Sequence, residues 1–244
     1  MSGNLEKTIE NLADEKRLIE LFNMDLLDSD LKRIALRNLN LIKKQDLLME
    51  IILNESDSSV GKEAVKTLID GKDDKEKHDL LLEIVSNAKN FDIACEALKL
   101  IRDSSYLEKV ALSKDNPSKI RANAVNRIVN PIFGSDLDMF LEDDDWRVRH
   151  AAINLGMKED VLMDIVNNDE DNRVRSKALR TIGNGKLLYD FALSEMYLPL
   201  VFTAINRMYN YELVRKIYDA SDDELIKACA RDRLDFLEAG IATL

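Results

Sequence analysis

The sequence predicts an all-α fold, built as a right-handed α-solenoid of about eight two-helix repeats. Its composition favours helices over sheets, because 33% of the 244 residues are charged, only 6% are aromatic, and there are 8 Gly and 3 Pro. An alanine recurs along the chain, in most copies with one apolar residue four positions before it and another four positions after it. A further apolar residue precedes most of these alanines by sixteen positions. A pattern that recurs in this way is the signature of a repeat protein.

The recurring alanines mark the second helix of each repeat, which we call the B helix. Val174, Ala178 and Ile182 show the pattern. Residues four apart share one face of an α-helix, and a small residue between them lets neighbouring helices pack closely. The copy around Ala152 reaches its closing Leu-Gly one position early, which predicts a shorter helix there. The repeats are therefore centred on Ala35, Ala64, Ala97, Ala124, Ala152, Ala178, Ala204 and Ala230.

The apolar positions sixteen residues earlier mark the first helix of each repeat, the A helix. They are Ile19, Leu48, Leu81, Leu162, Leu188 and Val214. Repeats four and five show this position only loosely, in the stretches YLEKVAL and LDMFL. Pro117 and Pro199 fall where B helices begin and Pro131 falls where one ends, and these are places that tolerate proline.

Helix starts and domain limits follow from the same alignment. Ser105 with Glu108, and Ser221 with Glu224, match the capping box and predict that these serines begin helices. Because the repeats run through the whole chain, residues 1–244 are predicted to form a single domain. A helix at 4–13 and the acidic eighth repeat are expected to cap the two ends, since solenoid ends need a polar outer face.

Two repeats carry a fuller motif. Residues 143–156 read DDDWRVRHAAINLG and residues 171–185 read DNRVRSKALRTIGNG, so both run from acidic turn through Arg-Val-Arg to glycine. This motif resembles HEAT repeats, especially the short form of phycobilin-lyase-like HEAT proteins, and the resemblance covers roughly residues 15–240. It implies that B helices line the concave side of a curved solenoid, and that a ladder of basic residues pairs with turn acids. The ladder positions hold Lys32, Arg121, Arg149 and Arg175, and are interrupted by Gly61, Ala94 and Val201.

The overall charge and the termini restrict the partners and the location. A net charge of -11 argues against non-specific binding of nucleic acid or anionic membrane by the whole surface. No run of about 18 apolar residues occurs and the N-terminus has no signal-peptide core, so we expect a cytoplasmic protein without membrane contact. Cys95 and Cys229 stand far apart in apolar helical context and are interpreted as reduced core thiols.

The sequence shows no pattern that predicts catalysis. Its only histidines are His78 and His150, so no His-rich iron or zinc site can be assembled. Phosphate-binding loops, dinucleotide fingerprints and nucleophile elbows are missing. The acidic runs EDDD and DEDN stand at turns, where carboxylates cap helices. We therefore expect no enzyme activity, no cofactor and no metal.

The charges of the B helices predict a binding surface. The first seven B helices carry a net +9 although the whole chain carries -11. Long basic or amide side chains recur two positions after the central alanines and, together with one neighbouring arginine, form the predicted stripe: Arg33, Arg37, Lys66, Lys99, Asn126, Asn154 and Arg180. Such a stripe suits an acidic segment or a phosphate backbone. The alternative is an ordinary solvated face whose charges pair with neighbouring acids.

Trp146 and His150 are the candidate anchor residues beside the stripe. Trp146 is either an exposed anchor for a partner or a wedge between repeats. The leading hypothesis for the chain is a monomeric protein-interaction scaffold that binds an acidic segment on its B helices. A nucleic-acid-binding or repair protein of the HEAT-like glycosylase type is the first alternative, and a chromophore lyase, by family analogy alone, is the second.

Overall fold

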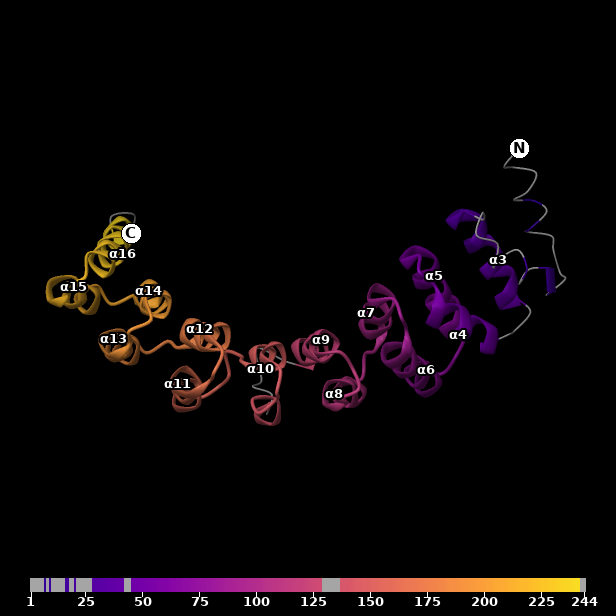
Figure 1. The fold of residues 1–244 in the computed structure, drawn as a ribbon, viewed down its shortest axis with the longest axis horizontal. Coiled ribbons are helices and arrows are strands. Elements are labelled where there is room, and N and C mark those ends of the chain that lie inside the picture. The colour runs from indigo at the N-terminus through magenta and orange to yellow at the C-terminus, as the bar shows by residue number, and fades with distance from the viewer. Residues whose placement is uncertain are drawn as a thin grey trace. The chain divides into compact units, whose positions relative to one another are not determined.

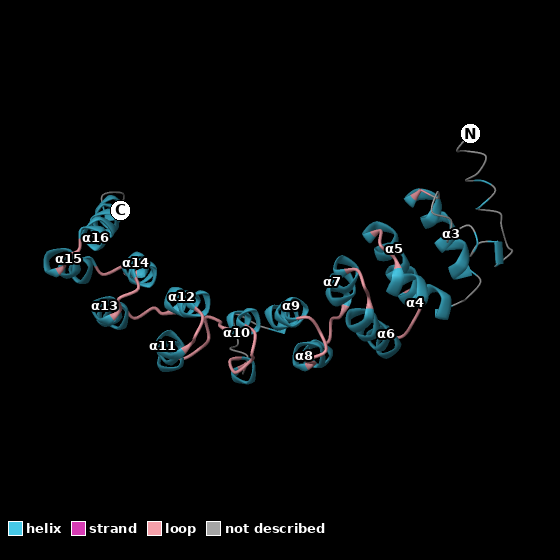
Figure 2. Cartoon of the chain, in the orientation of Figure 1, coloured by secondary structure: helices cyan, strands magenta, loops and turns pink. Residues whose placement is uncertain are grey.

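The computed structural model of the chain describes residues 28–41, 45–128 and 137–241, and five isolated residues nearer the N-terminus (7, 9, 16, 17 and 20). Over these residues it contains helices and no β-strand, so the predicted all-α class is confirmed (Figures 1 and 2). The chain divides into two compact units, residues 1–124 and 125–244, which we describe one after the other. Most of the predicted helix at 4–13, as well as Ile19 and Pro131, lies outside the described residues.

The first unit alternates A and B helices in the predicted order. It contains α3 (Ser29–Leu41), α4 (Gln45–Asn54), α5 (Ser58–Ile69), α6 (Asp74–Asn87), α7 (Phe91–Leu100), α8 (Ser104–Leu112) and most of α9 (Ser118–Ile128). The B helices α3, α5 and α7 contact one another in sequence order, and so do the A helices α4, α6 and α8. Each repeat in this unit is therefore a helix pair that packs on its neighbours.

The second unit continues the alternation with one reduced repeat. It contains η1 (Asp138–Phe140), α10 (Trp146–Ala152), α11 (Glu159–Asn168), α12 (Asn172–Thr181), α13 (Gly185–Ser194), α14 (Leu198–Arg207), α15 (Tyr211–Ala220) and α16 (Glu224–Ile241). The B helices α10, α12, α14 and α16 pack in that order. The loosely patterned stretch LDMFL forms only the 3₁₀ turn η1, and α10 ends at Ala152, which confirms the predicted short helix.

The central alanines form the middle of the core. All eight of them have 0% of their surface exposed, which confirms the helix faces assigned from the sequence. Most of the described apolar residues four positions away are buried too, among them Val60, Ile93, Val174 and Leu200. A methyl side chain at each crossing lets the B helices approach each other closely, while the larger residues above and below fill the remaining space.

Helix starts are set by short polar residues, most of them aspartates. Asp103 caps α8, because its carboxylate accepts the backbone N–H of Ser105, so the prediction that Ser105 begins this helix is wrong. Asp223 accepts the backbone N–H groups of Leu225 and Ile226 at the start of α16, so the same prediction for Ser221 is wrong. In both places a competing aspartate with a charged acceptor stands near the serine.

The basic ladder ties each B helix to the turn that precedes the next one. Arg149 pairs with Asp169 (Nε to Oδ2, 2.8 Å), Arg175 pairs with Glu195, and Lys32 pairs with Glu55 (3.4 Å). Each of these acids also accepts the backbone N–H of the residue two positions later. The acid thereby orders the turn before the next helix while the base fixes that turn to the preceding repeat.

Gly61 stands at one interruption of the ladder, and its missing side chain is required by packing. A Cβ at this position would lie 2.0 Å from Cδ1 and 2.6 Å from Cγ1 of the buried Ile93 in α7. Gly61→Ala is therefore expected to lower the free energy of unfolding by about 1 kcal/mol, although alanine normally stabilises a helix interior by about that amount. The urea midpoint measures this effect.

Gly240→Ala is the matched control for this prediction. Gly240 lies near the end of α16, and an added Cβ there would meet no atom within 4 Å. The urea midpoint of Gly240→Ala should therefore equal that of the wild type or lie slightly above it. A raised midpoint for Gly61→Ala would show that α5 and α7 are less closely packed than described.

Candidate functional site

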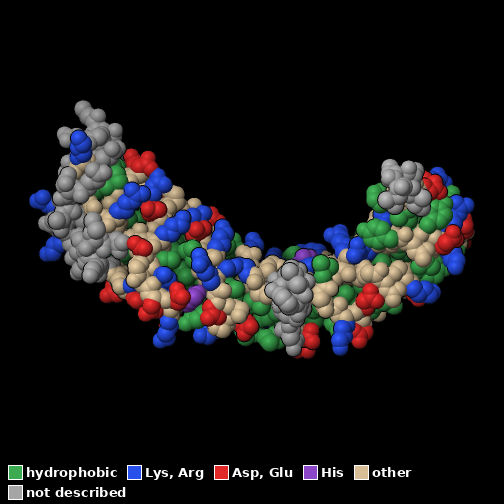
Figure 3. All heavy atoms as spheres, turned by 180° about the vertical axis from the view of Figure 1, so that it is seen from behind, with side chains coloured by type: hydrophobic (Ala, Val, Ile, Leu, Met, Phe, Trp, Pro, Cys, Tyr) green, Lys and Arg blue, Asp and Glu red, His purple; other side chains and the backbone are tan. Residues whose placement is uncertain are grey.

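The basic residues of the predicted stripe in the first unit are all engaged with acids. Arg37 pairs with Glu63 (3.3 Å), and Arg33 pairs with Asp30 on its own helix. Glu96 receives two lysines, Lys66 at 3.9 Å and Lys99 at 3.7 Å. Acidic and basic side chains are correspondingly intermixed on the face of this unit seen in Figure 3. These exposed pairs are weak, each worth roughly 0 to 1 kcal/mol, but they cancel the charge that a ligand would meet.

The pairing follows a simple geometric rule. The residue two positions after a central alanine reaches the residue just before the central alanine of the next B helix. Arg37 of α3 meets Glu63, which precedes Ala64, and Lys66 of α5 meets Glu96, which precedes Ala97. In these two places the residue before the next central alanine supplies the compensating acid, whereas Lys99 pairs with Glu96 of its own helix.

Arg180 obeys the same geometry but meets no acid. The next B helix, α14, carries Thr203 just before Ala204, and Arg180 and Thr203 line the same hollow. Arg180 is exposed, and within the described parts of the chain it makes no hydrogen bond or ion pair. It is thus the one basic member of the predicted stripe whose charge is not compensated by a neighbour in these parts.

The two asparagines of the predicted stripe lie elsewhere. Asn126 is exposed on α9 and lines neither of the hollows beside Arg180. Asn154 was expected on the exposed stripe, and this is wrong, because its surface is only 6% exposed. Since α10 ends at Ala152, Asn154 lies beyond the helix and its side chain binds the carbonyl of Ala152 and the N–H of Gly156. Asn154 therefore orders a turn.

Two adjoining hollows beside Arg180 form what we call the α12–α14 groove. The larger has a volume of about 580 Å³, and its walls come from α10, α12, α14 and the turn before α14. The smaller, about 240 Å³, continues it along α14 past Asn206 and Arg207. Arg180 and Thr203 belong to both hollows. The lining of the groove combines aromatic and apolar side chains with hydroxyl, imidazole and guanidinium groups.

Trp146 supports the basic wall of this groove. Its ring lies 3.5 Å from the guanidinium carbon of Arg173 and 4.8 Å from that of Arg147. It is half-buried against the apolar core of the second unit. Of the two roles predicted for Trp146, this placement fits the wedge between repeats better than the exposed anchor, because the ring already stacks on the protein's own side chains.

Asp171 holds the guanidinium of Arg173 from the other side. Nε and Nη2 of Arg173 donate to the two carboxylate oxygens at 2.9 and 2.6 Å. This side-chain hydrogen bond, with the backbone N–H of Arg173, lowers the pKa of Asp171 to about 2. The carboxylate therefore stays ionised at neutral pH, and it both caps α12 and orients Arg173.

His150 lines the groove. Its ring meets Trp146 edge-on, with the centroids 6.1 Å apart. Burial lowers the pKa of His150, and the nearby Lys177 and Arg180 lower it further against an opposing effect of Asp171. The imidazole is therefore neutral at pH 7, with one donor and one acceptor nitrogen. Lys177 donates to the backbone carbonyl of His150 at 2.7 Å, and burial lowers the lysine's own pKa.

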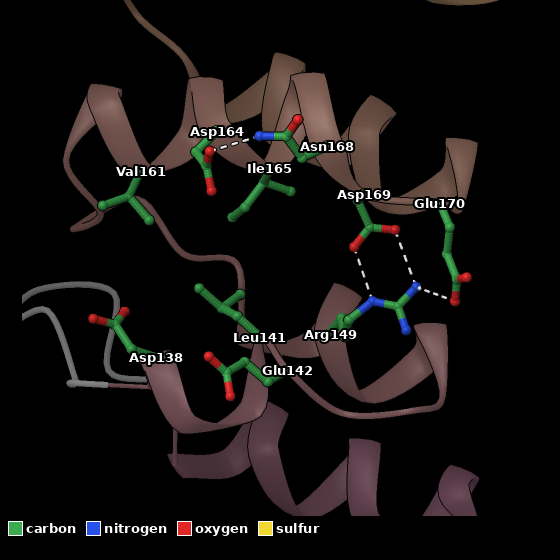
Figure 4. Close-up of a pocket in the computed structure, with 10 residues that line it drawn as sticks. All are labelled: Asp138, Leu141, Glu142, Arg149, Val161, Asp164, Ile165, Asn168, Asp169 and Glu170. Atoms are coloured by element: carbon green, nitrogen blue, oxygen red, sulfur yellow. Dashed lines mark hydrogen bonds and ion pairs between the residues drawn. The ribbon is translucent and has the colours of Figure 1, made fainter.

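A separate acidic pocket of about 470 Å³ lies between η1 and α11 (Figure 4). Asp138 and Glu142 face it from one side, and Asp164 faces it from α11, where it accepts a hydrogen bond from Asn168 at 2.7 Å. The only base in its lining is Arg149, which is bound to Asp169. Across the described residues, no group of three or more His, Cys, Asp or Glu is arranged to hold a metal ion.

The sequence analysis missed Arg173, Ser176 and Thr203 as groove residues. Two signals could have found them. Stepping back by one helical turn from the position of Arg180 gives Ser176 and then Asn172, and both line the groove. Thr203 stands just before a central alanine, in the position that Glu63 and Glu96 occupy in the first unit. Because threonine carries no charge, it cannot form an ion pair with the basic residue of the preceding B helix.

Comparison with known proteins adds no assignment. No protein-family model matches the chain, and neither a curated protein nor a solved structure matches it. Among the described helices, none combines the length and the apolar character needed to cross a membrane. The function is therefore argued from the groove itself.

Proposed function

We propose that the chain is a HEAT-like α-solenoid that serves as a protein-interaction scaffold without catalytic activity, and that the α12–α14 groove binds an acidic segment of its partner. The solenoid is supported by the eight buried alanines, by the ordered packing of B helices within each unit, and by the ladder from base to turn acid. In such an array each repeat contacts its neighbours and leaves a long row of helix faces for binding.

The observation that carries the binding proposal is the unpaired guanidinium of Arg180. Its equivalents Arg37 and Lys66 are neutralised by Glu63 and Glu96, whereas Arg180 faces Thr203 across a hollow of about 580 Å³. A carboxylate that enters the hollow can take the place that glutamates occupy in the first unit. The hydroxyl of Thr203 and the neutral imidazole of His150 supply further hydrogen-bonding groups.

A protein segment suits this surface better than a nucleic-acid backbone. Phosphate recognition depends on a row of free basic side chains, and each contact releases counterions from the nucleic acid. The basic stripe residues of the first unit are already paired, and the whole chain carries -11. An uncompensated guanidinium in a groove that is also lined by aromatic and apolar side chains matches an acidic peptide with few charges.

Charge reversal at Arg180 tests the proposal. A fluorescein-labelled peptide of alternating glutamate and glycine is the probe, and fluorescence anisotropy at low salt is the measurement. Arg180→Glu should weaken binding at least about tenfold while leaving helicity and melting unchanged, because the side chain is exposed and unpaired. Lys216→Glu, the same charge change on the exposed surface of the A helix α15, is the control and should bind like the wild type.

A second variant makes this test specific to the groove. Thr203→Glu places a carboxylate where the first unit has Glu63, so this carboxylate should pair with Arg180. The variant should then bind the peptide about as weakly as Arg180→Glu does. If the wild type, Arg180→Glu and Thr203→Glu bound the peptide with equal affinity, the groove would not be its binding site. Loss of binding in Lys216→Glu alone would move the binding surface to the A helices.

A further inference from the structure

The α12–α14 groove holds a second guanidinium, that of Arg173, at a fixed spacing from Arg180. Both side chains line the larger hollow, and both belong to α12, seven residues apart. Seven residues make almost two full turns, so the two side chains leave the same helix face about 10 Å apart along its axis. The larger hollow thus presents two arginines whose backbone positions are separated by a spacing that helix geometry sets.

Arg173 is oriented by the protein before any ligand binds. Asp171 holds its Nε and Nη2, and the ring of Trp146 stacks on it at 3.5 Å. Within the described residues its Nη1 has no hydrogen-bond partner, and 58% of the side-chain surface is exposed. A guanidinium fixed in this way loses little conformational freedom on binding a carboxylate. Because Asp171 already compensates part of the charge of Arg173, Arg173 should bind a ligand carboxylate more weakly than Arg180 does.

The side chain that α12 contributes to the lining of the hollow between the two arginines is uncharged and polar. Ser176 lies on the same face of α12, and its hydroxyl is 3.5 Å from that of Thr203 on α14. These hydroxyls can donate to or accept from the backbone of a bound chain without demanding a particular side chain. A ligand with a charge at each end of this interval and a bare backbone between them fits the arrangement.

Building on the function proposed above, we propose that the groove selects acidic segments in polyproline II conformation whose carboxylates stand three residues apart. In this conformation three residues make one turn with a rise of about 3.1 Å each, so residues i and i+3 point the same way about 9 Å apart. That distance matches the rise of roughly 10 Å between the two arginine positions on α12. In a β-strand, residues three apart point to opposite faces, so only one of the two could be reached.

Two peptides of identical composition test the spacing. Both carry fluorescein at the N-terminus; one reads Pro-Glu-Pro-Pro-Glu-Pro and the other Pro-Pro-Glu-Glu-Pro-Pro, and proline keeps both in the same conformation. Anisotropy titration of the full chain should give at least about threefold tighter binding of the spaced peptide. Arg173→Gln should abolish this preference, and Arg180→Gln should weaken both peptides about tenfold. Lys216→Gln is the control and should retain both the affinity and the preference.

The outcomes separate this inference from the proposed function. Equal binding of the two peptides to the wild type would overturn the spacing and leave acidic-segment binding intact. A preference that survives Arg173→Gln would also overturn it, because another group would then set the spacing. If neither peptide bound, the proposed function itself would fail. If a single-stranded oligonucleotide displaced the labelled peptide at a lower concentration than the unlabelled peptide does, the two guanidiniums would be assigned to phosphates. That result would overturn both the spacing inference and the proposed function.

Discussion

Replacing Arg149 by methionine is expected to lower the free energy of unfolding by about 3 to 5 kcal/mol, the largest effect of any substitution considered for this chain. Arg149 is 7% exposed, and its guanidinium binds both oxygens of Asp169 at 2.8 and 3.0 Å. It also donates to the backbone carbonyl of Asp143 at 2.8 Å. One side chain therefore holds α10, the turn before it and the turn after α11 together.

The cost arises because methionine leaves its former partners without a donor. Asp169 has only 9% of its side chain exposed, so its charge would remain in a poorly solvated place with the N–H of Asp171 as its remaining partner among these contacts. Arg149→Lys should recover only part of the loss, since an ammonium cannot make the two parallel bonds to the carboxylate and also reach the carbonyl of Asp143.

Arg147→Met provides the matched control two residues away. Arg147 lies on the same helix and is more exposed, and among the described residues its one ion pair is with Asp145 at 3.2 Å. Chemical denaturation of both variants, followed by helical circular dichroism, measures the difference. Equal midpoints for Arg149→Met and Arg147→Met would mean that the ladder contributes no more than an ordinary surface pair.

The helix pattern could be predicted from the sequence because it depends on local periodicity. A triplet such as Val174, Ala178 and Ile182 must lie on one helix face whatever the rest of the chain does, and all eight central alanines are fully buried. The short α10 was also predictable, because its closing residues come one position early. These features need information from one helix only.

The site was predicted less well because it depends on pairs of helices. Counting charges along single B helices placed Lys66 and Lys99 on a free basic stripe, but Glu96 of α7 compensates both. The pairing of Lys66 follows from the contact between one B helix and the next, which a charge count ignores, whereas Lys99 pairs within its own helix. Asn154 failed for a different reason, because the periodic pattern was extended past the end of α10 into a turn. Arg180 keeps an uncompensated charge within the described residues because Thr203, the residue before the next central alanine, carries none.

Overpacking at a central alanine is the second large effect that we expect. Ala178→Leu should lower the free energy of unfolding by about 3 kcal/mol, because three added carbon atoms must enter a place with 0% exposure. Ala178 belongs to the apolar core of the second unit, and its helix α12 packs against α10, α11 and α14. The crossing helices must therefore separate or the side chain must adopt a strained rotamer.

Ala228→Leu, the same substitution on the exposed surface of the B helix α16, distinguishes overpacking from a general effect of leucine. Ala228 lies two residues before the buried Ala230, so the two positions face different sides of one helix. Its unfolding midpoint should remain close to that of the wild type, since the added carbons extend into solvent. If Ala178→Leu melted like Ala228→Leu, the central alanines would not lie at tight helix crossings. The role of the repeated alanine as the residue that sets helix spacing would then have to be abandoned.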